Sequence, residues 1–116
     1  MQFSQHFLKK NREFVRVFNF GKTFECQSLK IKWLENKLDY FRFGIIVSTK
    51  IDKRAVIRNK IKRRLRAIFK EFAREIKSGF DFVVMTRPAI KTLDYHQIRE
   101  IINNFLEKNN LRKVSF

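Results

Sequence analysis

The sequence is poor in the residues that build several classes of functional site. Its one cysteine, Cys26, cannot form a disulfide within the chain, which favours a reducing compartment. The two histidines, His6 and His96, lie far apart, so no zinc-ligand spacing is present. The three glycines are scattered and form no glycine-rich phosphate loop. We find no catalytic residues and no metal ligands in this pattern.

Acidic residues and long apolar runs are also scarce. Asp39 and Asp52, near the ends of one predicted strand, are better explained by turns than by metal binding. No apolar run approaches the roughly 18 residues of a membrane span. The N-terminal residues include Lys9 and Lys10 and lack the apolar core of a secretory signal. We expect one cytoplasmic domain over residues 1–116, with residues 1–10 and 109–116 loosely ordered.

Positive charge is what the sequence has in excess. It contains 27 Lys and Arg residues against 11 Asp and Glu residues, a formal charge of +16. Such a charge indicates a polyanionic partner, either a nucleic acid or an acidic membrane surface. The charge is densest at residues 50–70, where Asp52 is the single acid.

This basic stretch has the periodicity of a helix. Its apolar residues recur at helical spacing, at Ile57, Ile61, Leu65, Ile68, Phe69, Phe72 and Ile76. The pattern predicts a helix from about Ala55 to Lys77, with Asp52 as a cap near its start. The opposite side of this helix carries Asn59, Arg63, Arg66, Lys70 and Arg74. Such a face suits phosphate contacts, although composition does not decide between DNA and RNA. A solvated helix is one alternative. A membrane-surface helix is another, but it would expose apolar residues that the core needs.

The other elements follow from shorter patterns. A short helix is predicted at about residues 12–19, with Asn11 as its N-cap and Gly21 ending it. Residues 23–34 alternate in two registers, which indicates either a bulge or two short strands at Gln27-Ser28. Apolar strands follow at 41–47 and 80–85, and Asp94 begins a last helix. This order predicts an α+β two-layer sandwich, with a β-α-β crossover around the basic helix.

The basic helix also resembles a known signature. Its sequence Arg58-Asn59-Lys60-Ile61-Lys62-Arg63, continuing to Arg66, resembles that of the bacterial ribonuclease P protein subunit. The resemblance extends over about residues 8–108. It includes the segments 8–18, 43–48 and 79–87 and the closing helix.

The resemblance implies a fold, a function and partners. The implied order is α-β-β-β-α-β-α with a left-handed β-α-β crossover, where chain-topology rules alone favour the right-handed one. The implied partners are the catalytic RNA of ribonuclease P and precursor tRNA, with no membrane or DNA partner expected. The protein would assist removal of the 5′ leader from the tRNA. The RNA subunit would hold the Mg²⁺ ions and perform the hydrolysis, which agrees with the missing catalytic residues.

The resemblance also implies two sets of site residues. The RNA-binding set comprises Arg58, Asn59, Lys60, Lys62, Arg63 and Arg66, with Lys50, Lys53 and Arg54 in a preceding loop that departs from many family members. The leader-binding cleft comprises Phe14, Phe18, Lys30 and Lys32. From the residues alone, Phe14 and Phe18 read as core residues. The alternative functions are a general RNA-binding or ribosome-associated protein and a stand-alone nuclease.

Overall fold

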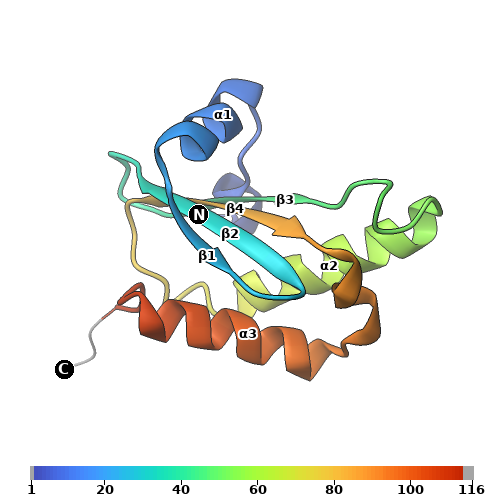
Figure 1. Cartoon of the computed structure of the whole chain (residues 1–116). Coiled ribbons are helices and arrows are strands. Elements are labelled where there is room, and N and C mark those ends of the chain that lie inside the picture. Colours follow the sequence, from blue (N-terminus) through green and yellow to red (C-terminus); the bar gives the residue numbers. More distant parts are fainter. Residues whose placement is uncertain (1, 114–116) are drawn as a thin grey trace.

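Three α-helices and a four-stranded sheet form the structure, a computed structural model that describes residues 2–113. The elements in chain order are η1 (Phe3–His6), α1 (Asn11–Phe20), β1 (Lys22–Glu25), β2 (Leu29–Glu35), β3 (Arg42–Ile46), α2 (Ala55–Glu71), β4 (Phe80–Thr86), η2 (Pro88–Thr92) and α3 (Tyr95–Lys108) (Figure 1). Apart from the two short 3₁₀ helices, this is the predicted order, so the α+β prediction is confirmed.

The sheet has the strand order β1-β2-β4-β3, so the last strand in the chain lies between two earlier ones. β1 and β2 are antiparallel neighbours, with Phe24 opposite Ile31. Of the two possibilities at Gln27-Ser28, two short strands is therefore the correct one. β2 pairs antiparallel with β4, and β3 pairs parallel with β4. The parallel pair is joined through α2, as the predicted β-α-β unit requires. Its left-handedness stays a prediction of the resemblance.

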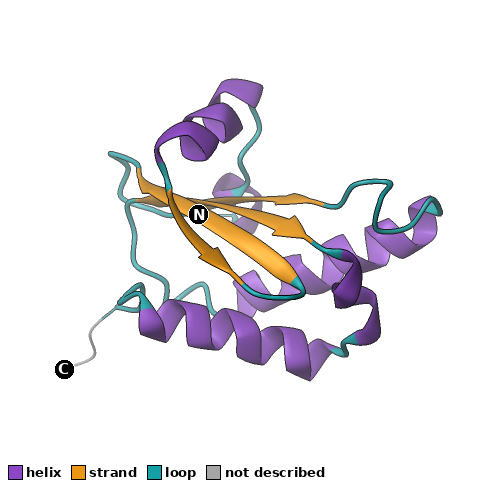
Figure 2. Ribbon diagram, in the orientation of Figure 1, coloured by secondary structure: helices purple, strands orange, loops and turns teal. Residues whose placement is uncertain are grey.

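Helices cover the two faces of the sheet unequally. α2 and α3 lie against one face, and α1 lies on the other (Figure 2). The main core fills the first interface, where the alternate residues Leu29 and Ile31 of β2 are fully buried. The apolar stripe of α2 meets them there, with Ile61, Leu65, Ile68 and Phe69 all buried. The predicted apolar side of this helix is confirmed. Its burial leaves the opposite side of α2 facing solvent.

A smaller core lies under α1. Val17 of α1 and Val83 of β4 are fully buried there, with Phe14 and Phe18 partly buried around them. Gly21 follows α1 at φ −77°, so it is not a left-handed cap as the sequence suggested. A Cβ at this position would lie 2.5 Å from the Val17 carbonyl oxygen, which explains why glycine is needed where the chain turns into β1.

The helix boundaries differ from the predictions in two places. α2 ends at Glu71 instead of Lys77, although Ile76 is still buried in the main core and forms an isolated bridge with Arg112. The N-cap of α1 is Lys10 instead of Asn11. The Lys10 amide donates a hydrogen bond to the Glu13 carboxylate at 2.8 Å, which satisfies a donor at the start of the helix.

Both ends of the described chain are more ordered than the sequence suggested. Phe7 forms a parallel bridge with Phe43, and the buried Leu8 donates its amide to the Phe43 carbonyl at 2.9 Å. At the other end, Leu111 is buried and Lys113 donates its amide to the Glu75 carbonyl at 2.7 Å. The expectation of loose ends is wrong for residues 3–8 and 111–113. Residues 1 and 114–116 lie outside the described part.

Candidate RNA interface

The outer face of α2 is a continuous basic surface. Asn59, Lys60, Arg63 and Arg66 are exposed there, while Lys62 is half-buried at the flank. From Ala55 to Lys70 the helix carries no acid, so the positive charge is not neutralised within it. The structure therefore places these predicted RNA-binding residues on one side of one rigid element. Their contacts with RNA stay a prediction.

Arg58 has a role that the sequence did not reveal. Its Nη1 donates hydrogen bonds to the carbonyl oxygens of Asp52 at 2.9 Å and of Lys53 at 2.7 Å. These bonds fasten the loop before α2 onto the first turn of the helix. Arg58 is half-buried as a result, so it organises the loop besides carrying the signature charge.

The loop itself presents fewer free charges than its composition suggests. Arg54 forms a double hydrogen bond with the Asp52 carboxylate, at 3.0 and 2.9 Å, and Lys91 approaches the same carboxylate at 3.3 Å. The hydrogen bonds from the Arg54 side chain and backbone hold the pKa of Asp52 well below its usual range. Lys50 and Lys53 are exposed beside this pair. Of the three loop residues predicted to bind RNA, Arg54 is therefore the one whose charge is paired with Asp52.

The residues predicted to form the leader-binding cleft come from α1 and from the face of β2 that α1 covers. Phe14 and Phe18 of α1 are half-buried against the small core, so they are both part of that core and partly accessible. Lys32 of β2 donates from Nζ to the Phe18 carbonyl at 2.7 Å. Lys30 lies two residues before it on the same face and approaches Glu25 at 3.5 Å. The geometry is thus compatible with both interpretations of these aromatic residues, as core residues and as leader-binding residues.

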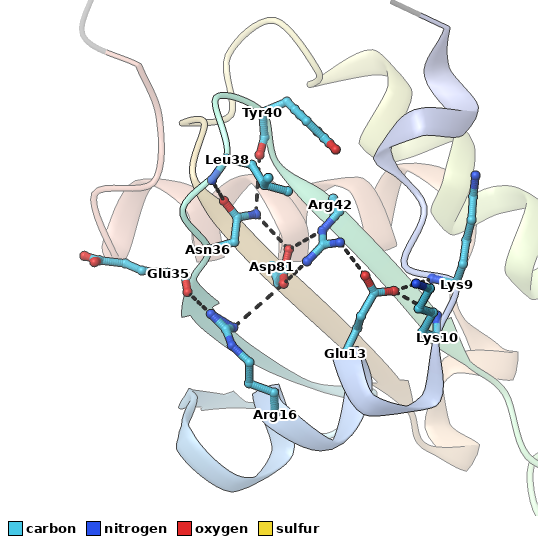
Figure 3. Close-up of polar contacts among 10 residues, drawn as sticks. All are labelled: Lys9, Lys10, Glu13, Arg16, Glu35, Asn36, Leu38, Tyr40, Arg42 and Asp81. Atoms are coloured by element: carbon cyan, nitrogen blue, oxygen red, sulfur yellow. Dashed lines mark hydrogen bonds and ion pairs between the residues drawn. The ribbon is translucent and has the colours of Figure 1, made fainter.

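A buried network anchors α1 beside this cleft (Figure 3). Asp81 of β4 has 1% of its surface exposed, and its carboxylate accepts two hydrogen bonds from Arg42 of β3, at 2.9 and 2.8 Å. Asn36 donates a third at 2.8 Å. Arg42 also pairs with Glu13, and Arg16 of α1 lies 3.9 Å from the Asp81 carboxylate. Two strands and one helix are therefore fixed to a single buried charge.

The pKa values of this network follow from its contacts. Burial pushes the pKa of Glu13 upward, but the amides of Lys10 and Lys9 and the charge of Arg42 outweigh it, so the pKa lies below its ordinary value. The hydrogen bonds to Asp81 raise the pKa of Arg42. Sequence reasoning missed this network. A lone acid inside the apolar strand Phe80–Met85 was the available signal.

No group of three or more His, Cys, Asp or Glu residues that could hold a metal ion occurs within the described residues 2–113. None of the helices in that range is long and apolar enough to cross a membrane.

Comparison with known proteins decides which family has this arrangement. The family model for ribonuclease P matches residues 3–110. The chain belongs to the ribonuclease P protein family. A ribonuclease P protein component from Caldanaerobacter subterraneus subsp. tengcongensis is 36% identical over 104 residues, covering 90% of this chain and 89% of that protein. One from Geobacillus kaustophilus is 37% identical and covers 88% of this chain and 84% of its own length.

Solved structures of ribonuclease P proteins have the same fold. A Staphylococcus aureus ribonuclease P protein, a mutant with defective mRNA degradation activity, superposes with a TM-score of 0.86 at 33% identity, over 93% of this chain and 91% of that chain. The Thermotoga maritima ribonuclease P protein superposes with a TM-score of 0.79 at 33% identity, over 87% of this chain and 94% of that chain. The family resemblance seen in the signature helix is confirmed.

Proposed function

We propose that this ribonuclease P protein binds the catalytic RNA of ribonuclease P through the outer face of α2. The observation that carries the proposal is the uncompensated positive charge from Ala55 to Lys70, held on a helix whose other side is buried. Cations in a fixed array neutralise phosphates and release counterions, which favours RNA binding at low salt. Arg63 and Arg66 contribute exposed guanidinium groups to this array.

The 5′ leader of precursor tRNA is the second proposed ligand, bound in the cleft between α1 and the sheet. Phe14 and Phe18 supply aromatic surface on which unpaired bases stack without sequence preference. Lys30 and Lys32 bring positive charge to the same face. In this proposal the protein orients the substrate in the cytoplasm, and the RNA subunit holds the Mg²⁺ ions and performs the hydrolysis.

Leader removal from precursor tRNA by a bacterial ribonuclease P RNA, with and without the purified protein at low Mg²⁺, tests this function. We expect faster removal when the protein is present. No gain in rate would exclude the proposed role. The same reaction without the RNA subunit tests for a stand-alone nuclease, a control that matters because an mRNA degradation activity is named for the Staphylococcus aureus protein. Competition with unrelated structured RNAs separates this function from general RNA binding.

A further inference from the structure

A pocket lies at the outer edge of β3, between the basic face of α2 and the cleft beneath α1. The N-terminal segment pairs with the edge of β3 at Phe43, whose carbonyl accepts a hydrogen bond from the Leu8 amide, and both residues line the pocket. Its volume is about 290 Å³. Its lining includes Phe7 and Lys9 of the N-terminal segment, Phe14 of α1, Gly44 and Ile45 of β3, and Arg66 of α2.

The walls of this pocket combine flat apolar surface with positive charge. The Arg66 guanidinium lies over the Phe7 ring, with its carbon 5.1 Å from the ring centroid. The Phe14 ring lies directly against the Gly44 backbone, since a Cβ at this glycine would lie 2.3 Å from a ring carbon. Among the described residues that line the pocket, two are cations and none is acidic. Aromatic and guanidinium planes beside cations are what proteins use to hold unpaired nucleotides.

The position of the pocket links the two proposed RNA surfaces. Arg66 belongs to the basic face of α2, and Phe14 belongs to the cleft, so both surfaces end at this pocket. A strand of RNA that passes from one surface to the other crosses the β3 edge here. We propose that the pocket binds one unpaired nucleotide, with its base against the aromatic and guanidinium planes and its phosphate near Lys9. This inference rests on the proposed function and adds a site to it.

The nucleotide can come from the leader of precursor tRNA or from the catalytic RNA, and two binding measurements distinguish these sources. Lys9→Ala removes the pocket charge but keeps the fold contact, since it is the Lys9 amide that donates to Glu13 at 3.0 Å. Lys108→Ala is the matched control, because this exposed lysine lies at the end of α3 in the other layer. Phe7→Leu removes the aromatic plane and keeps an apolar side chain. Thermal unfolding checks that each variant is folded.

The first measurement is the dissociation constant of each protein for the catalytic RNA alone. The second is the dissociation constant of the reconstituted holoenzyme for precursor tRNA with a long leader and with a leader of about one nucleotide. We expect Lys9→Ala to weaken one of these constants about 5-fold or more and Phe7→Leu to weaken the same constant about 5- to 100-fold. Weaker long-leader binding identifies the leader, and weaker assembly identifies the catalytic RNA.

The inference is overturned if Lys9→Ala matches Lys108→Ala in both measurements while the unaltered protein stimulates leader removal. If Phe7→Leu is unfolded, the comparison of Lys9→Ala with Lys108→Ala alone decides whether the pocket binds a nucleotide. An unaltered protein that neither binds the catalytic RNA nor stimulates leader removal overturns the proposed function first, and this inference with it.

Discussion

The buried Arg42–Asp81 pair gives a strong test of what holds α1 in place. Arg42→Met leaves the Asp81 carboxylate, only 1% exposed, without the two hydrogen bonds from Arg42 at 2.8 and 2.9 Å, and only the hydrogen bond from Asn36 remains. Asp81→Leu leaves the Arg42 guanidinium, 20% exposed, with Glu13 as its remaining carboxylate partner. Removing one member of a buried ion pair costs about 3–5 kcal/mol, because the other charge stays uncompensated. We expect each single variant to be destabilised by this amount.

The double variant, Arg42→Met with Asp81→Leu, removes both charges. We expect it to lower the free energy of unfolding by much less than the sum of the two single effects. Asn36 and Glu13 then each lose a partner, at about 1–3 kcal/mol for a group left unsatisfied. The free energy of coupling between the two positions is therefore expected to lie in the range of about 0.5–3 kcal/mol that residues of one ion-pair network show. Because domains of this size are stable by about 5–15 kcal/mol, both single variants should still fold at low temperature.

Urea unfolding measures these free energies through the fluorescence of Trp33. This residue is 7% exposed and packs edge-on against Phe105 at 5.2 Å, so its emission reports the main core. Each single variant should lower the unfolding midpoint by at least about 1 M urea. Glu25→Gln is the control, since its pair with Arg87 at 3.3 Å is exposed and worth less than about 1 kcal/mol. Single effects as small as the control, or effects that simply add in the double variant, would refute the reasoning.

Three further predictions concern single positions. Gly44→Ala places a methyl group about 2.3 Å from a Phe14 ring carbon, so we expect it to destabilise the protein by about 1–3 kcal/mol in urea unfolding. Adding Phe14→Leu to this variant should recover part of the lost stability. An unchanged urea midpoint for Gly44→Ala would contradict the contact. Burial pushes the pKa of Glu13 upward, but backbone amides and Arg42 hold it below 4.5. The contribution of Glu13 to the stability of the folded protein is therefore complete above about pH 4.5. It is lost as the pH falls through the lower pKa that Glu13 has in the folded state. Glu13→Gln should flatten this acid-side loss in unfolding measured against pH, and an unaltered slope would exclude the role. Arg63→Ala should reduce the salt slope of catalytic RNA binding by about 0.7–0.9 for one lost phosphate contact and leave thermal unfolding unchanged, whereas an unchanged slope would remove Arg63 from the interface.

Local patterns were sufficient to predict most of the elements. The apolar stripe of α2 could be predicted because helical spacing places Ile61, Leu65 and Ile68 on one side, and all three are buried. The start of α3 was readable because Asp94 and Gln97 form a local capping box, with Gln97 donating its amide at 2.9 Å. In both cases the decisive interaction is made within a few residues or is set by periodicity.

Contacts between distant residues were not predictable in the same way. Arg42 and Asp81 are 39 residues apart, and only the parallel register of β3 and β4 places them opposite each other. The order of the N-terminal segment was missed for the same reason, since Phe7 depends on the exposed edge of β3. The loop-fastening role of Arg58 required the fold of the loop itself. The resemblance supplied the predicted site residues, which stay predictions, but not these supporting contacts.

The place of β4 between β2 and β3 has a consequence for synthesis on the ribosome. β4 ends at Thr86, long after the chain has produced β2, β3 and the whole of α2. Until then the inner edges of β2 and β3 have no partner strand, and unpaired edges are sites of unwanted association. Phe82 and Val84, which complete the surface under α2, are also missing. The nascent chain therefore carries its full set of signature cations before it can hold them in a fixed array, so the proposed RNA-binding face is complete only after this strand has been made.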